Sequence, residues 1–106
     1  MDSDRELLEL AAKAAGIEGE IKKIFGGWPC VMRKNGHAWQ PLHDDGDALR
    51  LAVDLDFDIE LTEDAAWAGG INSQNHQLYE WHRNCKYAAT RRAIVRAAAS
   101  IGKAMP

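Results

Sequence analysis

Residues 86–102, with the sequence KYAATRRAIVRAAASIG, carry the clearest helical periodicity in the chain. Four apolar residues of this segment share one stripe at helical spacing: Ile94, Ala97, Ala98 and Ile101. At 100° per residue, three basic residues fall almost opposite that stripe: Arg92, Arg96 and Lys103. This pattern is typical of an amphipathic helix that packs one face on a core. We therefore predict a helix from about Lys86 to Gly102.

Two further helices are expected earlier in the chain. Ser3 followed by Glu6 forms a capping box, and Gly16 can take the left-handed conformation after a helix end, so we predict a helix over residues 3–15. A second helix is expected to begin at Asp44 or Asp45, where a side-chain oxygen can cap free backbone N–H groups. From residue 53 to residue 62 the chain also alternates like a strand, so we place the helix end near Asp56.

A β-hairpin is expected over residues 31–40. Asn35-Gly36 favours the positive φ angles of a two-residue type I′ turn. That turn would set Met32 opposite Trp39 and Lys34 opposite His37.

Three later segments are expected to form strands. Residues 57–62 alternate between apolar and polar side chains, and weaker strands are expected over residues 66–68 and 78–81, with a polar loop at 72–76 between them. The expected fold class is α+β, with three helices and a mainly antiparallel sheet of about four strands.

Length and composition indicate a single domain over residues 1–106. The chain has 46% apolar and 27% charged residues, which is ordinary for a folded protein. We find no apolar stretch long enough to span a bilayer and no basic-then-apolar leader, and Cys30 and Cys85 form no close pair. We therefore expect a cytoplasmic protein without a membrane partner.

Charge is distributed unevenly although the net charge is only −3. Residues 44–64 contain nine acids and the single base Arg50, whereas residues 81–106 contain six bases and no acid. Two groups of residues are candidates for an interaction surface: Arg91, Arg92, Arg96 and Lys103 in the basic segment, and Asp56, Asp58 and Glu60 in the acidic one. The basic group could bind phosphates, but it could equally be a solvated helix face or pair with the acidic segment.

Familiar catalytic and cofactor motifs are missing. Asp54, Asp56 and Asp58 imitate the start of a calcium loop, but Ile59 replaces its glycine and Ala65 its final glutamate. Two loose groups of zinc-ligand types lack close ligand pairs: His76, His82 and Cys85, and Cys30, His37 and His43. The double glycines at 26–27 and 69–70 open no phosphate-binding loop. We therefore assign no catalytic, metal or cofactor residues and expect no cofactor.

Aromatic residues leave two interpretations open. Six rings could pack in the sheet's core, which we favour, or form an exposed patch for stacking or protein binding: Trp28, Trp39, Trp67, Tyr79, Trp81 and Tyr87.

Three stretches, residues 4–16, 39–53 and 87–99, resemble the phage ABA sandwich domain, a family of small phage and prophage proteins. The resemblance implies a layered α/β/α sandwich and a bacterial host cell, and no catalytic or ligand-binding residues can be carried over from it. Asp56 and Asp58 depart from its pattern at a place where a glycine turn is expected.

Two functions are therefore expected from the sequence. The first is a non-catalytic phage or prophage accessory protein that binds another protein or a second copy of itself. The alternative is a nucleic-acid-binding module that uses the basic C-terminal helix, although the acidic pI of about 5.7 opposes it. An enzyme is the interpretation we favour least, because no nucleophile and base stand at motif spacing.

Overall fold

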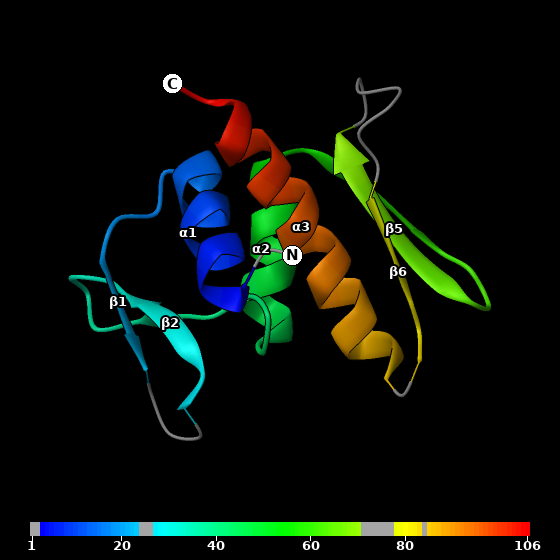
Figure 1. Ribbon diagram of the computed structural model, residues 1–106, viewed down its shortest axis with the longest axis horizontal. Helices are drawn as coiled ribbons and strands as arrows, with labels where there is room; N and C mark the ends of the chain where they lie inside the picture. The colour runs from blue at the N-terminus through cyan, green and yellow to red at the C-terminus, as the bar shows by residue number, and fades with distance from the viewer. Residues whose placement is uncertain (1–2, 24–26, 71–77, 84) are drawn as a thin grey trace.

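The computed structural model describes residues 3–23, 27–70, 78–83 and 85–106, and these form three helices and six strands (Figure 1). The elements in chain order are α1 (Asp4–Ala15), β1 (Glu20–Lys23), β2 (Pro29–Met32), β3 (Ala38–Trp39), α2 (Asp45–Asp54), β4 (Phe57–Leu61), β5 (Ala65–Gly70), β6 (Leu78–Trp81) and α3 (Lys86–Ala104). The α+β class and the three helices are confirmed. The predicted loop at 72–76 and Gly26 lie outside the described residues.

Local capping chemistry sets the helix ends. The Ser3 hydroxyl accepts the backbone N–H of Glu6 at 3.1 Å, and Gly16 ends α1 with a φ of 70°. Asp44 caps α2 by accepting the N–H of Asp47 at 2.8 Å. The thiol of Cys85 accepts the N–H of Ala88 at the start of α3. The predicted helices therefore begin and end close to their expected positions.

The turn between α2 and β4 lies where the sequence places the helix end. Asp56 has a φ of 56°, in the left-handed region that disfavours most side chains and tolerates Asp. β4 begins at the next residue, so the predicted strand over residues 57–62 is confirmed to within one residue. Asp56 thus occupies the conformation for which a glycine was expected.

The hairpin prediction is right in place and wrong in register. Val31 pairs with Trp39 and Met32 pairs with Ala38, one residue away from the expected register. Arg33 and Gly36 close a turn by a backbone hydrogen bond, and Gly36 has a φ of 87°. A three-residue loop that ends in one left-handed glycine explains this register, because a type I′ turn needs two residues with positive φ.

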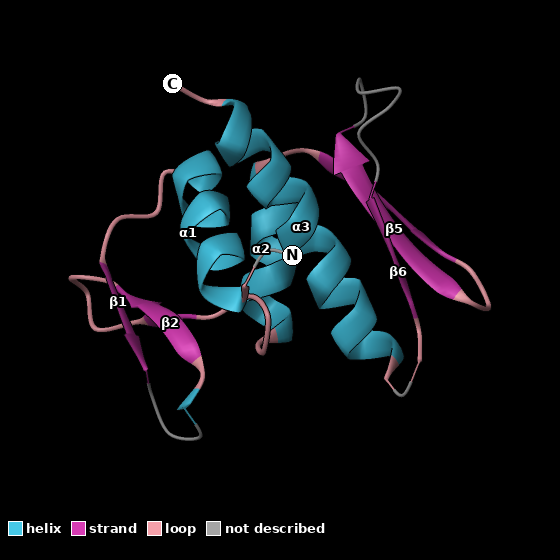
Figure 2. Ribbon diagram, viewed as in Figure 1, coloured by secondary structure: helices cyan, strands magenta, loops and turns pink. Residues whose placement is uncertain are grey.

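The strands form two antiparallel three-stranded sheets, β1-β2-β3 and β4-β5-β6. In Figure 2 the helices lie between the two sheets, with α1 beside the first and α3 against β5 and β6 of the second. The expected single sheet of about four strands, with helices on its outer faces, is therefore not what the described residues form. The sequence prediction did not include β1, whose four residues are mostly exposed.

Small residues on α3 allow the helices to approach closely. Ala93, Ala97 and Ala98 are buried in the core that α1, α2 and both sheets share. Gly102 meets α1 so closely that a Cβ there would overlap the carbonyl group of Leu10. Within the described residues, no helix is long and apolar enough to cross a membrane.

Candidate functional site

The Arg91 side chain is mostly covered and is paired within the molecule. Its Nη1 lies 2.6 Å from Asp45 Oδ1, and its Nε donates to the Leu42 carbonyl at 3.0 Å. Only 17% of the Arg91 side chain is exposed. It therefore joins α3 to the start of α2, which is the pairing between basic and acidic segments that we considered from the sequence.

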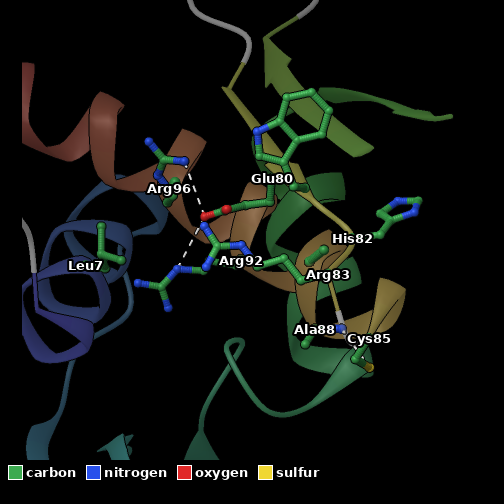
Figure 3. A pocket seen from close by; sticks show the side chains of 10 residues that line it. Leu7, Glu80, His82, Arg83, Cys85, Ala88, Arg92 and Arg96 are labelled. Carbon is green, nitrogen blue, oxygen red and sulfur yellow. Dashed lines mark hydrogen bonds and ion pairs between the residues drawn. The ribbon is translucent and has the colours of Figure 1, made fainter. Parts of the chain in front are cut away.

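Arg92 and Arg96 converge on Glu80 of β6 (Figure 3). Arg92 Nε lies 3.3 Å and Arg96 Nη1 3.2 Å from Glu80 Oε1, and Arg92 Nη1 also reaches Asp4 at 2.9 Å. Glu80 is 18% exposed, so two guanidinium groups surround a mostly covered carboxylate. Three of the four predicted basic residues thus form internal ion pairs, and Lys103 is exposed near the end of α3.

A cleft of about 790 Å³ lies beside these arginines, between the start of α3 and β6. Its lining includes His82, Arg83 and Cys85. Figure 3 shows the His82 ring pointing away from the arginines, and its Nδ1 lies 3.2 Å from the Glu63 carbonyl oxygen. The Cys85 thiol is engaged in capping α3. The described residues of the lining therefore present a charged surface and no paired nucleophile and base.

The acidic candidates lie on or beside β4. Asp58 and Glu60 are exposed and alternate with Phe57 and Ile59, which pack against the core. This alternation directs Asp58 and Glu60 to the face of the second sheet that lies opposite α3. Asp56 is part of the turn that precedes the strand.

Three aromatic side chains lie on that same face, and we call them the aromatic face: Trp67, Tyr79 and Trp81. The Trp67 and Tyr79 ring centroids are 4.9 Å apart, and those of Tyr79 and Trp81 are 5.4 Å apart in an edge-to-face arrangement. Tyr79 is 42% and Trp81 54% exposed. In Figure 2 no helix of the described residues covers this side of β5 and β6.

The aromatic face corrects our preferred interpretation of the rings as core. Of the six aromatic residues considered, Trp39 is buried, whereas Trp28, Tyr79, Trp81 and Tyr87 are exposed and Trp67 is half-buried. Alternation over residues 78–81 puts Tyr79 and Trp81 on one face and Glu80 on the other, and the ion pairs of Glu80 with Arg92 and Arg96, which the sequence does not show, make the ring-bearing face the outer one.

Cross-strand pairing in the second sheet places an acidic side chain next to the aromatic ones. Glu60 pairs with Trp67, and Trp67 pairs with Tyr79, so one row crosses all three strands. The three strands contain no Lys or Arg. The outward surface of this sheet is therefore aromatic with an acidic border.

Asp47 forms a second polar centre that the sequence did not reveal. Its side chain is only 3% exposed, and its carboxylate accepts from His37 Nε2 at 2.8 Å, the Gln40 N–H at 3.0 Å and Arg50 Nη1 at 3.4 Å. These contacts attach the β2–β3 hairpin to α2. A cleft of about 340 Å³ adjoins them, and the part of its lining that the structure describes has no Ser, Thr or Cys. The centre is suited to structural anchoring.

His43 stacks on Trp28 with ring centroids 4.1 Å apart. Burial lowers the pKa of His43 below its usual value, Asp4 opposes that shift, and Arg91 adds to it. Among the described residues, its Nε2 has no hydrogen-bond partner. This imidazole is therefore held in its neutral form more firmly than an exposed one.

Within the described part of the chain, no three His, Cys, Asp or Glu side chains gather as metal ligands. Cys30 is buried and Cys85 is exposed, and neither forms a disulfide. His76, a member of one loose zinc-type group, lies outside the described residues.

Comparison with known proteins finds no matching protein family, no matching curated protein and no matching solved structure. The phage-family resemblance remains a prediction from the sequence.

Proposed function

We propose that this chain is a non-catalytic binding protein whose main contact surface is the aromatic face of the β4-β5-β6 sheet. The observation that carries the proposal is the exposure of Tyr79 and Trp81 on a sheet surface that no described helix covers. Large rings held in place by one another are the side chains that most often dominate protein interfaces.

The packing of the rings supports a preorganised surface. Each ring contacts a neighbour on the same sheet, so binding a partner costs little side-chain entropy. Asp58 and Glu60 border the rings and would supply the polar rim that protein interfaces usually have. The partner is another protein; a second copy of the chain is the other possibility that the sequence raised.

Nucleic-acid binding by the basic C-terminal helix is the alternative function. Its cations would need to reach phosphates, but Arg91, Arg92 and Arg96 each contact a carboxylate of the same molecule. Lys103 alone of the four candidates forms no ion pair among the described residues. The internal pairs therefore favour protein binding over this alternative.

The resemblance of the sequence to the phage ABA sandwich domain supports the further proposal that this binding protein is a phage or prophage accessory protein that works in the cytoplasm of a bacterial host. A binding role also accounts for the absence of a nucleophile and base in contact along the described lining of the larger cleft.

The test compares two double variants that each replace exposed apolar residues by serine. Tyr79→Ser/Trp81→Ser alters the aromatic face, and Leu49→Ser/Val53→Ser alters exposed residues of α2. A partner is purified on the wild-type chain from its source cells, and its affinity for all three proteins is measured by calorimetry. We expect the aromatic double variant to bind at least about tenfold more weakly and the α2 variant to bind normally.

Two outcomes would overturn the proposal. One is that the wild-type chain retains no partner and is a monomer by light scattering. The other is that the partner binds the aromatic double variant as tightly as the wild type.

A further inference from the structure

We propose that the occupant of the aromatic face is an extended, basic segment of another protein, with its Lys or Arg side chains lying over the rings. This inference rests on the proposed function and adds the chemistry of the partner. It is carried by the placement of exposed rings next to carboxylates on three strands that contain no basic residue.

This surface attracts cations in two ways, through the faces of its aromatic rings and through its carboxylates. The faces of Trp and Tyr rings carry negative electrostatic potential, and Trp binds a cation best. Glu60 is the cross-strand neighbour of Trp67, so a cation over that ring would also lie close to a carboxylate. Asp58 is two residues further along the same face of β4, and exposed Glu63 and Asp64 follow in the β4–β5 turn.

An extended segment fits the shape of the surface. Glu60, Trp67 and Tyr79 form a row across the sheet, and Trp81 continues the rings along β6. An extended segment that crosses the sheet along this row would therefore meet the Glu60 carboxylate and then the rings of Trp67 and Tyr79. In an extended segment, alternate side chains point to the same side, so every second residue would face the aromatic face.

Two other occupants fit the charges less well. Single-stranded nucleic acid also stacks on rings, but its phosphates would be repelled by Asp58 and Glu60. A twofold dimer would place the same surface against itself and bring acidic borders together without a compensating base from these strands.

The experiment titrates the whole isotope-labelled chain with capped peptides of about ten residues that alternate Lys-Val, Gln-Val or Glu-Val, and with oligothymidine of similar length. Nuclear magnetic resonance follows the indole and backbone N–H signals. We expect only the Lys-Val peptide to shift signals of Trp67, Tyr79 and Trp81, with an affinity that falls as salt rises.

A matched pair of charge variants separates local from general electrostatics. Asp58→Asn/Glu60→Gln should weaken Lys-Val binding about threefold to tenfold, because two exposed carboxylates are lost from the border. Glu18→Gln/Glu20→Gln removes the same charge at exposed positions before and within β1 and should leave the affinity unchanged.

The possible failures are distinguishable. The basic-segment inference is wrong, and the proposed function stands, if the Gln-Val or Glu-Val peptide shifts the signals of the aromatic face as strongly as the Lys-Val peptide. The same conclusion follows if no peptide shifts those signals while the purified partner still requires Tyr79 and Trp81. Selective shifts by oligothymidine, or a concentration-dependent dimer that shifts the same signals, would also refute the inference. Lys-Val shifts confined to another surface would refute the inference, and the proposed function would fail with it only if the purified partner also bound Tyr79→Ser/Trp81→Ser as tightly as the wild type.

Discussion

At the scale of single residues, Asp47 is the charged side chain that the described residues bury, and stability is expected to depend on it. Its buried carboxylate accepts a hydrogen bond from the Gln40 N–H and contacts His37, so it fixes the hairpin to α2. Replacing it leaves a part-buried backbone N–H without its acceptor.

We expect Asp47→Ala to lower the free energy of unfolding by about 2–4 kcal/mol, measured by urea denaturation. Asp54→Ala, in the last turn of the same helix but exposed, is the control and should change stability by less than about 0.5 kcal/mol. Equal losses in the two variants would show that the carboxylate of Asp47 has no special role.

His43 gives the protein a predicted sensitivity to mild acid. Its pKa is lowered mainly by burial, so the unfolded chain takes up the proton at a higher pH than the folded chain does. The stability contributed by neutral His43 is complete at pH values above the ordinary histidine pKa of about 6.5, which applies to the unfolded chain. This stability is lost progressively as the pH falls below that pKa.

We therefore expect the free energy of unfolding of the wild type to fall from about pH 7 toward about pH 5 more steeply than that of His43→Gln. Urea denaturation at several pH values measures both slopes. Parallel pH profiles would mean that His43 titrates alike in the folded and unfolded chains.

Residue-scale predictions from the sequence succeeded where the chemistry is local. The Ser3 cap, the Asp44 cap and the left-handed Gly16 each depend on neighbours within a few positions. The role of Asp47 depends on the approach of a hairpin to a helix, and an isolated aspartate in an acidic stretch carries no signal of that approach.

At the scale of elements, the crossing of α1 and α3 depends on Gly102. A Cβ at this position would lie 2.8 Å from the carbonyl carbon of Leu10 and overlap its oxygen, and both atoms belong to backbone that cannot yield easily.

Gly102→Ala should therefore lower the free energy of unfolding by about 1–3 kcal/mol, although alanine normally stabilises a helix relative to glycine. Gly46→Ala in α2 is the matched control. Its new methyl group would meet only the ends of side chains, at 3.1 Å from Arg50 Nη1 and 3.3 Å from Asp44 Oδ2, so stability should stay constant or rise by up to about 1 kcal/mol. Stabilisation by Gly102→Ala in urea denaturation would contradict the close crossing.

Periodicity predicted the elements better than their pairing. The helices and the strand at β4 follow from repeats within their own residues, whereas the hairpin register depended on which residue of a short loop takes positive φ. β1 has only Ile21 half-buried between exposed residues, so it lacks an amphipathic pattern and is ordered by its partner β2.

At the scale of the whole molecule, α3 is the helix that forms ion pairs with three other elements. Its arginines join it to α1 through Asp4, to α2 through Asp45 and to β6 through Glu80. The layer order, with helices between two sheets, could not be predicted from the sequence because it depends on such contacts between distant segments. The sequence identified the cations of the candidate basic surface, but their partners within the molecule are visible only in the folded structure.

These internal pairs predict how the protein behaves toward nucleic acid. The wild-type chain should leave a labelled DNA duplex unshifted in a low-salt gel, because its net charge is −3 and its arginines are paired. The triple variant Asp4→Asn/Asp45→Asn/Glu80→Gln brings the net charge to zero and frees the three arginines. It should retard the duplex at low salt and release it as salt rises.

The control removes three charges without breaking those pairs. Asp54→Asn/Asp58→Asn/Glu60→Gln also brings the net charge to zero, so it should remain close to the wild type if local pairing, rather than total charge, keeps the arginines from phosphates. Circular dichroism would confirm that both triple variants fold, which the first must show because in it the mostly covered Arg91 side chain loses its charged partner and the mostly covered Glu80 is replaced. If the wild type itself retarded the duplex in a salt-sensitive way, the basic helix would be a nucleic-acid surface despite its ion pairs. If both triple variants retarded the duplex equally, the effect would be due to net charge alone.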